Sequence, residues 1–245
     1  DFSPKGQLWG NPIYNWDYLR ETDFDWWIKR IKWCLSIHDV VRIDHFRGFD
    51  SYYAIDYNSE DATKGQWLDG PGIKFFTCLK EKLDNLEIIA EDLGFLTQSV
   101  KSLLLLTGFP GMKILQFAFN PNQEENYYLP HNYSANSVVY TGTHDNDTIR
   151  GWFESCDENT IKHAIKYGAL TNEEGLNWGM IRMAYSSISD LAIIPIQDFL
   201  NLGTDCRMNT PSTINGNWRF RLSEDMLTDK LASKINELTK LYGRM

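Results

Sequence analysis

Acidic residues stand at the ends of three apolar runs of the sequence that have the pattern of β-strands. Asp44 closes the first run together with Arg42, Glu91 follows the second, and Asp145, next to His144, follows the fourth. Because strand side chains alternate with period two, Arg42 and Asp44 should point the same way. Functional groups of parallel α/β folds gather at the carboxyl ends of strands, so we expect these acids at one rim of a sheet.

Several carboxyl groups at one rim suit the cleavage or transfer of a glycosidic bond with retention. That chemistry uses two carboxyl groups about 5–5.5 Å apart, one attacking the anomeric carbon and one protonating the leaving oxygen. Asp44, beside a guanidinium that favours a charged carboxylate, suits the nucleophile. Glu91 leaves an apolar strand and should face other acids, and both effects raise its pKa, which suits a general acid. A third carboxylate, Asp145, can hold a substrate hydroxyl or support the transition state.

Each acid also has an ordinary structural explanation. An acid at a strand end often caps the next helix, and Asp92, Asn146 and Asp147 are candidates for that role. An Arg–Asp pair can be a plain salt bridge. The five histidines show neither HxxxH nor HExxH spacing, and we expect no metal and no cofactor. Three acids at three strand ends, one with Arg and one with His, favour catalysis.

The composition excludes some classes of protein. Lys and Arg number 24 and Asp and Glu 33, a net charge of −9, which argues against nucleic acid and anionic membranes as partners. The four cysteines show no CxxC spacing and are expected to be free thiols in a reducing compartment. No targeting peptide opens the chain, so we expect a cytoplasmic location. Aromatic residues make up 14%, which fits either a large core or a cleft with exposed rings.

The elements that must position the acids alternate between strand and helix. Strands are expected at residues 40–46, 86–90, 112–119, 137–141 and 191–196. Helices are expected at 24–37, 73–83 and 97–106, over parts of 148–188 and at 222–242, with a loop at 203–217. This alternation predicts a parallel sheet covered by helices, which either a doubly wound sheet or a (β/α)8 barrel satisfies. Neither GxGxxG nor GxxxxGK[ST] occurs, so the common marks of a nucleotide site are missing.

Three blocks of sequence around the acids carry a resemblance to a known family. They are RIDHFRGF at 42–49, AEDLG at 90–94 and TGTHDND at 141–147. These blocks resemble the signatures of the 4-α-glucanotransferases, the amylomaltase or disproportionating-enzyme family, which is related to the α-amylases. The resemblance keeps its order and spacing over nearly the whole chain, through further blocks at 6–12, 108–113, 115–119, 129–133, 207–209 and 216–218.

The resemblance implies a role for each site residue. It implies that Asp44 is the nucleophile, Glu91 the general acid/base and Asp145 the acid that stabilises the transition state. Arg42 would orient the nucleophile. The other implied substrate-binding positions are His144, Gln7, Trp9, Phe117 and Asn209. Core packing is the alternative explanation for the two aromatic residues of that set.

The reaction that the resemblance implies is the transfer of an α-1,4-glucan segment from a donor maltodextrin to the 4-hydroxyl of an acceptor glucan. The residue chemistry does not separate transfer from hydrolysis, because both use the same carboxylates. A retaining α-glucan hydrolase of amylase type therefore stays open as an alternative. A non-catalytic glucan-binding relative also stays open, although the complete set of Asp44, Glu91 and Asp145 speaks against it.

The fold that the resemblance implies is a (β/α)8 TIM barrel, which has eight strands. Five strands can be placed, and the strand that carries the nucleophile would be the fourth. We therefore expect residues 1–245 to be the C-terminal part of a catalytic barrel, supplying about strands 4 to 8 and the C-terminal helices. Strands 1–3 would lie upstream of a chain that does not begin with Met. The part that carries them is a candidate partner if it is a separate chain.

Overall fold

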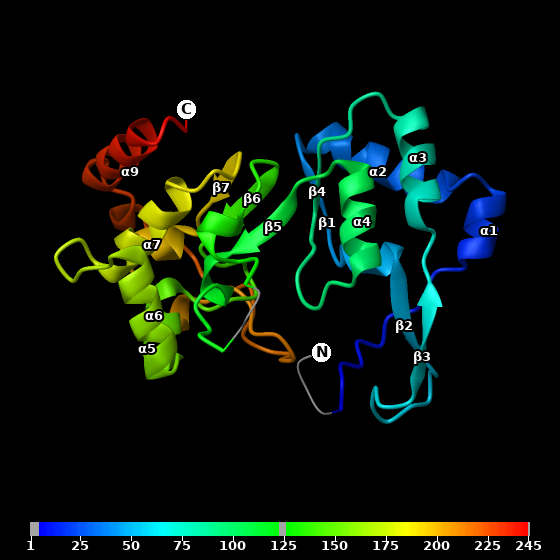
Figure 1. Cartoon of the computed structure of the whole chain (residues 1–245), viewed down its shortest axis with the longest axis horizontal. Coiled ribbons are helices and arrows are strands. Elements are labelled where there is room, and N and C mark those ends of the chain that lie inside the picture. The colour runs from blue at the N-terminus through cyan, green and yellow to red at the C-terminus, as the bar shows by residue number, and fades with distance from the viewer. Residues whose placement is uncertain (1–4, 123–125, 245) are drawn as a thin grey trace. The chain divides into compact units, whose positions relative to one another are not determined.

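The computed structural model describes residues 5–122 and 126–244, and the chain divides into two compact units. Unit 1 is Asp1–Met112 and unit 2 is Lys113–Met245 (Figure 1). Each unit has its own hydrophobic core. In the described part of the chain, no helix combines the length and the apolar character that crossing a bilayer requires.

Unit 1 is built on short parallel strands covered by helices. β1 (Val41–Ile43) pairs with β4 (Ile88–Ala90), and Ala90 pairs in turn with the first residue of β5 (Gly111–Ile114). The helices are α1 (Trp16–Glu21), α2 (Asp25–Ile37), α3 (Gly72–Lys82) and α4 (Gln98–Thr107). The Thr97 side chain caps α4 by accepting a hydrogen bond from the Val100 N–H, and Gly108 ends the helix in the left-handed conformation. The expected helices and strands of this unit are therefore confirmed in their order, while α1 is an additional helix that the sequence did not predict.

The core of unit 1 is unusually aromatic. Phe75 is fully buried, and its ring lies 5.1 Å from that of Phe49 and 5.8 Å from that of Trp27. Trp16 stacks near Trp27 at 6.2 Å. Such pairs contribute roughly 0.5–1.5 kcal/mol each beyond the area that they bury. Part of the aromatic excess therefore serves packing.

An antiparallel hairpin in unit 1 has no counterpart in the sequence prediction. It consists of β2 (Ser51–Ile55) and β3 (Gly65–Asp69), with Tyr53 directly opposite Trp67. The Arg47 guanidinium lies 4.4 Å from the centre of the Trp67 ring. The polar nine-residue stretch between the strands has none of the two-residue turn signals that mark a hairpin in a sequence.

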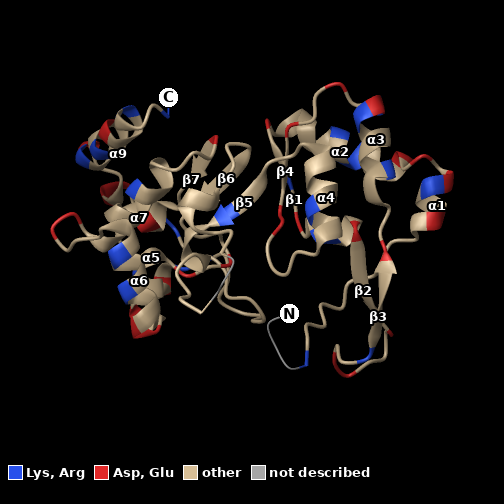
Figure 2. Cartoon of the chain, in the orientation of Figure 1, with Lys and Arg blue, Asp and Glu red and all other residues tan. Residues whose placement is uncertain are grey.

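Unit 2 places a buried strand among helices. β6 (Ser137–Tyr140) is buried along its whole length and pairs in parallel with β7 (Leu191–Ile193). α7 (Leu176–Tyr185) packs against four other helices. They are α5 (Ile149–Ser155), α6 (Glu158–Gly168), α8 (Ile196–Phe199) and α9 (Asp229–Leu241). Figure 2 shows most charges on helices and loops, with one each on β1, β3 and β5. By contrast, β4 and β6 carry none, as strands covered on both faces should.

The strand order is β1-β4-β5-β6-β7, so the strands that follow one another in the chain, apart from the hairpin, are also neighbours in the sheet. The predicted strand at 112–119 is wrong beyond Ile114, because Leu115–Phe117 forms a 3₁₀ turn. A short apolar run does not separate a strand from a buried helical turn. The last strand likewise ends at Ile193, and the last helix begins at Asp229 instead of residue 222, because the Thr228 side chain caps it there.

Candidate active site

In unit 1, Arg42 and Asp44 lie on the same side of the strand end, as predicted. β1 ends at Ile43, and Arg42 Nη2 is 3.4 Å from Asp44 Oδ1. The Asp44 side chain is 79% exposed, whereas that of Arg42 is 28% exposed. An ion pair this open to solvent adds little to stability. The plain salt-bridge explanation is therefore a poor account of the pair, and Asp44 is accessible to a ligand.

Backbone groups hold both the main chain and the carboxyl group of Glu91. Its N–H donates to the Ile43 carbonyl, and its own carbonyl accepts from the Phe46 N–H, both at 2.9 Å, so the β1–β4 pairing continues past the strand ends. Its carboxyl Oε2 accepts from the His45 N–H at 2.6 Å, and Oε1 accepts from the Leu93 N–H at 3.1 Å. Both carboxyl oxygens therefore face fixed donors.

Burial, and to a smaller extent the charge of Asp44, raise the pKa of the Glu91 carboxyl to about 7, against the opposing effect of the two backbone hydrogen bonds and Arg42. The sequence predicts that the pKa of Glu91 is raised, and that burial and a neighbouring acid raise it. A carboxyl group that titrates near neutral pH can both give and take a proton in one catalytic cycle.

His45 connects the acid pair to the segment near the N-terminus. It has φ 48° and ψ 55°, the left-handed conformation that aims its N–H at Glu91. Its ring meets the Trp9 ring edge-on at 5.1 Å, and Trp9 Nε1 donates to Gln7 Oε1 at 2.7 Å. Burial lowers the pKa of His45. Trp9 is 58% exposed, so core packing does not explain it.

In unit 2, a loop after β6 carries His144 and Asp145, and a buried carboxyl group holds both ends of that loop. Asp198 accepts hydrogen bonds from the Thr141 hydroxyl at 2.5 Å and from the Ile149 N–H at 2.7 Å. It is 2% exposed, and burial raises its pKa to about 6. Asp198 is not among the residues predicted from the sequence. Its signal is an acid in the apolar run IIPIQDFL, where a charge needs an internal partner.

Two side chains contact the carboxyl group of Asp145. His144 Nε2 lies 3.3 Å from its Oδ2, and Asn209 Nδ2 donates to its Oδ1 at 2.6 Å. Asn209, expected to bind substrate, is thus in contact with the carboxyl group itself. The Arg207 guanidinium donates to the Asp145 carbonyl at 2.5 Å, and the Trp218 ring lies 5.2 Å from that of His144. The sequence blocks at 207–209 and 216–218 therefore converge on this corner.

The helix-cap explanation for the neighbouring polar residues is wrong. Thr97 and Thr148 cap α4 and α5. Asp92 is buried, and its Oδ1 accepts from the Met112 N–H at 2.6 Å. A side chain at Gly111 would collide with this carboxyl, which explains the glycine there. Asn146 instead accepts from the Thr143 N–H and hydroxyl, and Asp147 accepts from the Thr204 hydroxyl.

Phe117 is the predicted site residue that the structure places differently. It lies in the 3₁₀ turn after β5 instead of on a strand. Its ring meets the Tyr128 ring edge-on at 5.4 Å, and 40% of its surface is exposed. Core packing therefore does not account for it. The exposed part of the Phe117 ring is available to a ligand, and the ring contact that the structure gives it in unit 2 is the one with Tyr128.

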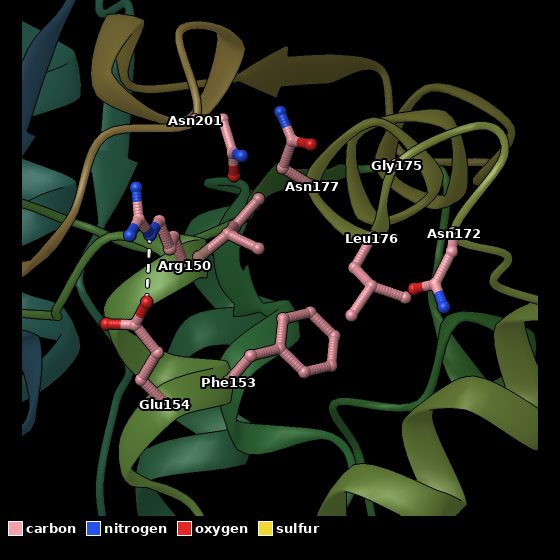
Figure 3. A pocket seen from close by; sticks show the side chains of 9 residues that line it. Arg150, Phe153, Glu154, Asn172, Gly175, Leu176, Asn177 and Asn201 are labelled. Carbon is pink, nitrogen blue, oxygen red and sulfur yellow. Dashed lines mark hydrogen bonds and ion pairs between the residues drawn. The ribbon is translucent and has the colours of Figure 1, made fainter.

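Two pockets lie within unit 2. One, of about 420 Å³, borders the corner just described, with His144, Asp147, Asp198 and Arg207 among its lining residues. The other, of about 330 Å³, lies where α5 faces the start of α7 and is drawn in Figure 3, with the Arg150–Glu154 pair at its edge. None of the predicted site residues lines the second pocket. Within residues 5–122 and 126–244, no three His, Cys, Asp or Glu side chains gather as metal ligands.

Comparison with known proteins gives one family. A family model described as 4-alpha-glucanotransferase matches residues 1–228. A 4-alpha-glucanotransferase of Clostridium butyricum is 53% identical over 244 residues, which are 99% of this chain and 50% of the relative. That of Synechocystis sp. is 51% identical over 245 residues, 99% of this chain and 48% of the relative. The chain thus spans about half the length of these curated relatives.

A solved structure points to the same family. An amylomaltase from Streptococcus agalactiae, in complex with acarbose, aligns with a TM-score of 0.95 and 43% identity, covering 99% of this chain and 49% of that one. The match confirms the fold class expected from the resemblance, the parallel strands and helices of an α/β barrel enzyme. Family model, relatives and structure agree, and the chain belongs to the 4-alpha-glucanotransferase family.

Proposed function

We propose that the protein carrying this chain is a 4-α-glucanotransferase, which moves α-1,4-glucan segments between maltodextrins by a retaining double displacement. The observation that carries the proposal is the pair in unit 1. Asp44 is exposed beside Arg42, while Glu91 is half-buried, and the pKa of its carboxyl group is about 7. A retaining mechanism needs one carboxylate and one proton donor, and the environments of these two groups favour that division.

The proposed reaction assigns a step to each group. Glu91 gives its proton to the glycosidic oxygen while an Asp44 oxygen attacks the anomeric carbon, so the leaving glucan departs and a glycosyl ester forms. Glu91 is then a carboxylate, and it takes the proton from the 4-hydroxyl of an acceptor glucan. The hydroxyl oxygen attacks the same carbon and releases Asp44.

The remaining site residues serve binding and stabilisation in this proposal. Asp145 and His144 hold the reacting sugar, and Arg42 orients Asp44. Trp9 and Phe117 offer exposed rings, on which the apolar faces of sugars pack. Gln7 orients Trp9 through its hydrogen bond to the indole.

We further propose that residues 1–245 are the C-terminal part of a catalytic barrel, in keeping with the half-length match to the relatives. Activity should therefore be measured on the complete protein in which this chain occurs. The cytoplasmic location expected from the sequence stays a prediction.

Incubation with maltotriose tests the activity. We expect free glucose together with dextrins longer than maltotriose and no net gain of reducing ends. A steady gain of reducing ends without longer products would identify a hydrolase and overturn the transferase proposal. Binding of maltotriose with neither outcome would identify a non-catalytic relative.

A further inference from the structure

We infer that Arg207 is a positioning residue for the carboxyl group of Asp145 and acts through Asn209. The inference rests on the proposed function, in which Asp145 serves the reacting sugar, and it assigns a task to two residues of a distant loop. Arg207 and Asn209 lie 62 and 64 residues from Asp145 in the sequence, and both contact it directly.

Arg207 joins the two segments through one rigid group. Its Nη2 donates to the backbone carbonyl of Asp145 at 2.5 Å, and its Nε donates to the backbone carbonyl of Asn209 at 2.8 Å. A guanidinium group is planar and presents its donors at fixed angles. Two bonds from one such group therefore fix the backbone of Asn209 relative to that of Asp145.

Asn209 transmits this restraint to the carboxyl group. Its N–H donates to the His144 carbonyl at 3.1 Å, and its Nδ2 donates to Asp145 Oδ1 at 2.6 Å. A hydrogen bond from an amide to a carboxylate is charge-assisted and strongly directional. With His144 Nε2 at 3.3 Å from Oδ2, each oxygen of Asp145 has its own neighbour.

The rest of the loop forms a frame for these contacts. The Trp218 N–H donates to the Met208 carbonyl at 2.6 Å, and the Thr210 N–H donates to Asn217 Oδ1 at 2.9 Å, so the loop closes on itself. Trp218 has φ +61°, a conformation that a bulky residue adopts only when its surroundings require it. Its ring lies against His144.

Stability alone does not explain this arrangement. The Asp145 side chain is 49% exposed, and contacts of exposed charges add little to the free energy of unfolding. What the contacts do determine is the orientation of a carboxylate that stays open to a ligand. Orientation is what a transition-state contact requires, since a displacement of about 1 Å can lower a rate roughly 10²-fold.

The first experiment compares Arg207→Ala and Arg207→Lys with the wild-type protein, using maltotriose. We expect Arg207→Ala to lower kcat roughly 10- to 100-fold with KM unchanged, because the transition-state contact loses its geometry. Lys supplies a single point donor, so Arg207→Lys should restore only part of the loss. Arg219→Ala removes an exposed charge from the same loop and is the matched control, with kcat expected to stay unchanged.

The second experiment is Asn209→Asp with a pH profile. The new carboxyl group donates to Asp145 only while it is protonated. Activity relative to wild type should therefore fall as the pH rises, and a purely structural role would not produce this trend. A raised KM with unchanged kcat in Arg207→Ala, or a flat ratio in Asn209→Asp, would overturn the inference.

A crystal structure of Arg207→Ala separates this inference from the proposed function. We expect Asp145 in more than one rotamer, and a single unchanged rotamer would refute the positioning role. This measurement needs no turnover. If the wild-type protein neither transfers nor hydrolyses maltotriose, the proposed function fails while the rotamer of Asp145 still decides the inference.

Discussion

Two carboxyl groups of this chain are held in opposite ways. In unit 1, backbone N–H groups of His45 and Leu93 face the two oxygens of Glu91. In unit 2, the side chains of Asn209 and His144 face the two oxygens of Asp145. Glu91 is therefore restrained by backbone groups, whose positions depend on the conformation of the chain, whereas Asp145 is restrained by two side chains and depends on the identity of those residues.

This difference has a chemical consequence. Backbone donors hold Glu91 in a half-buried position, where burial raises its pKa to about 7, which suits the proposed proton transfer. Side chains hold Asp145 where half of its side-chain surface stays open, which suits the proposed contact with substrate. Substitutions should therefore act differently on the two sites, and the following predictions test that difference.

The largest effect is expected for Glu91→Gln. It removes the proposed proton donor, and we expect kcat on maltotriose to fall roughly 10²- to 10⁴-fold. A donor with a fluoride leaving group needs no proton, so α-maltosyl fluoride should restore the first step. Asp44→Asn is the matched variant, since fluoride should not rescue the loss of a nucleophile. Equal rescue of both variants would contradict the assigned roles.

The next effect concerns Asp198, which holds both ends of the His144–Asp145 loop. Its folded pKa of about 6 lies above the ordinary 3.8, so the folded protein binds this proton more tightly than the unfolded chain. The stabilisation is complete below about pH 3.8 and is lost as the pH rises through about 6, a change of about 3 kcal/mol.

Asp198→Asn removes that titration and can keep both hydrogen bonds. Its oxygen accepts from the Ile149 N–H, and its NH₂ group donates to the Thr141 hydroxyl, which can rotate. We expect this variant to gain stability relative to wild type between pH 4 and pH 7 in urea unfolding. Asp198→Ala leaves both partners unpaired and should be destabilised at every pH. The same pH dependence in Asp198→Asn and wild type would show that Asp198 is not the titrating group.

A third prediction concerns the pH dependence of kcat/KM. In the proposed mechanism Glu91 carries its proton in the first step, so the wild-type value should fall about tenfold per pH unit above the pKa of about 7. With α-maltosyl fluoride this decline should vanish, because the leaving group takes no proton. A decline of the same size with the fluoride donor would assign it to another group.

The sequence predicts the part of this architecture that depends on local pattern. Alternating apolar runs indicate the parallel strands, and period-two alternation places Arg42 beside Asp44. Contacts between distant segments have no such pattern. The bond from Arg207 to Asp145 and the buried Asp198 become visible only when the loops are in place. The β2–β3 hairpin escaped prediction for a related reason, since its long polar connection has no turn signal.

The smallest effect tests the backbone restraint on Glu91. His45 adopts φ 48°, which aims its N–H at the Glu91 carboxyl. Asn tolerates this left-handed conformation, but a β-branched residue does not, and the conformation costs an ordinary residue about 1–2 kcal/mol. His45→Asn and His45→Val both lose the ring contact with Trp9, so their difference reports the backbone alone. We expect kcat for His45→Val to be about tenfold below that of His45→Asn. If the two variants had equal activity, the left-handed conformation of residue 45 would not be what holds Glu91. The backbone restraint that distinguishes Glu91 from Asp145 would then be wrong.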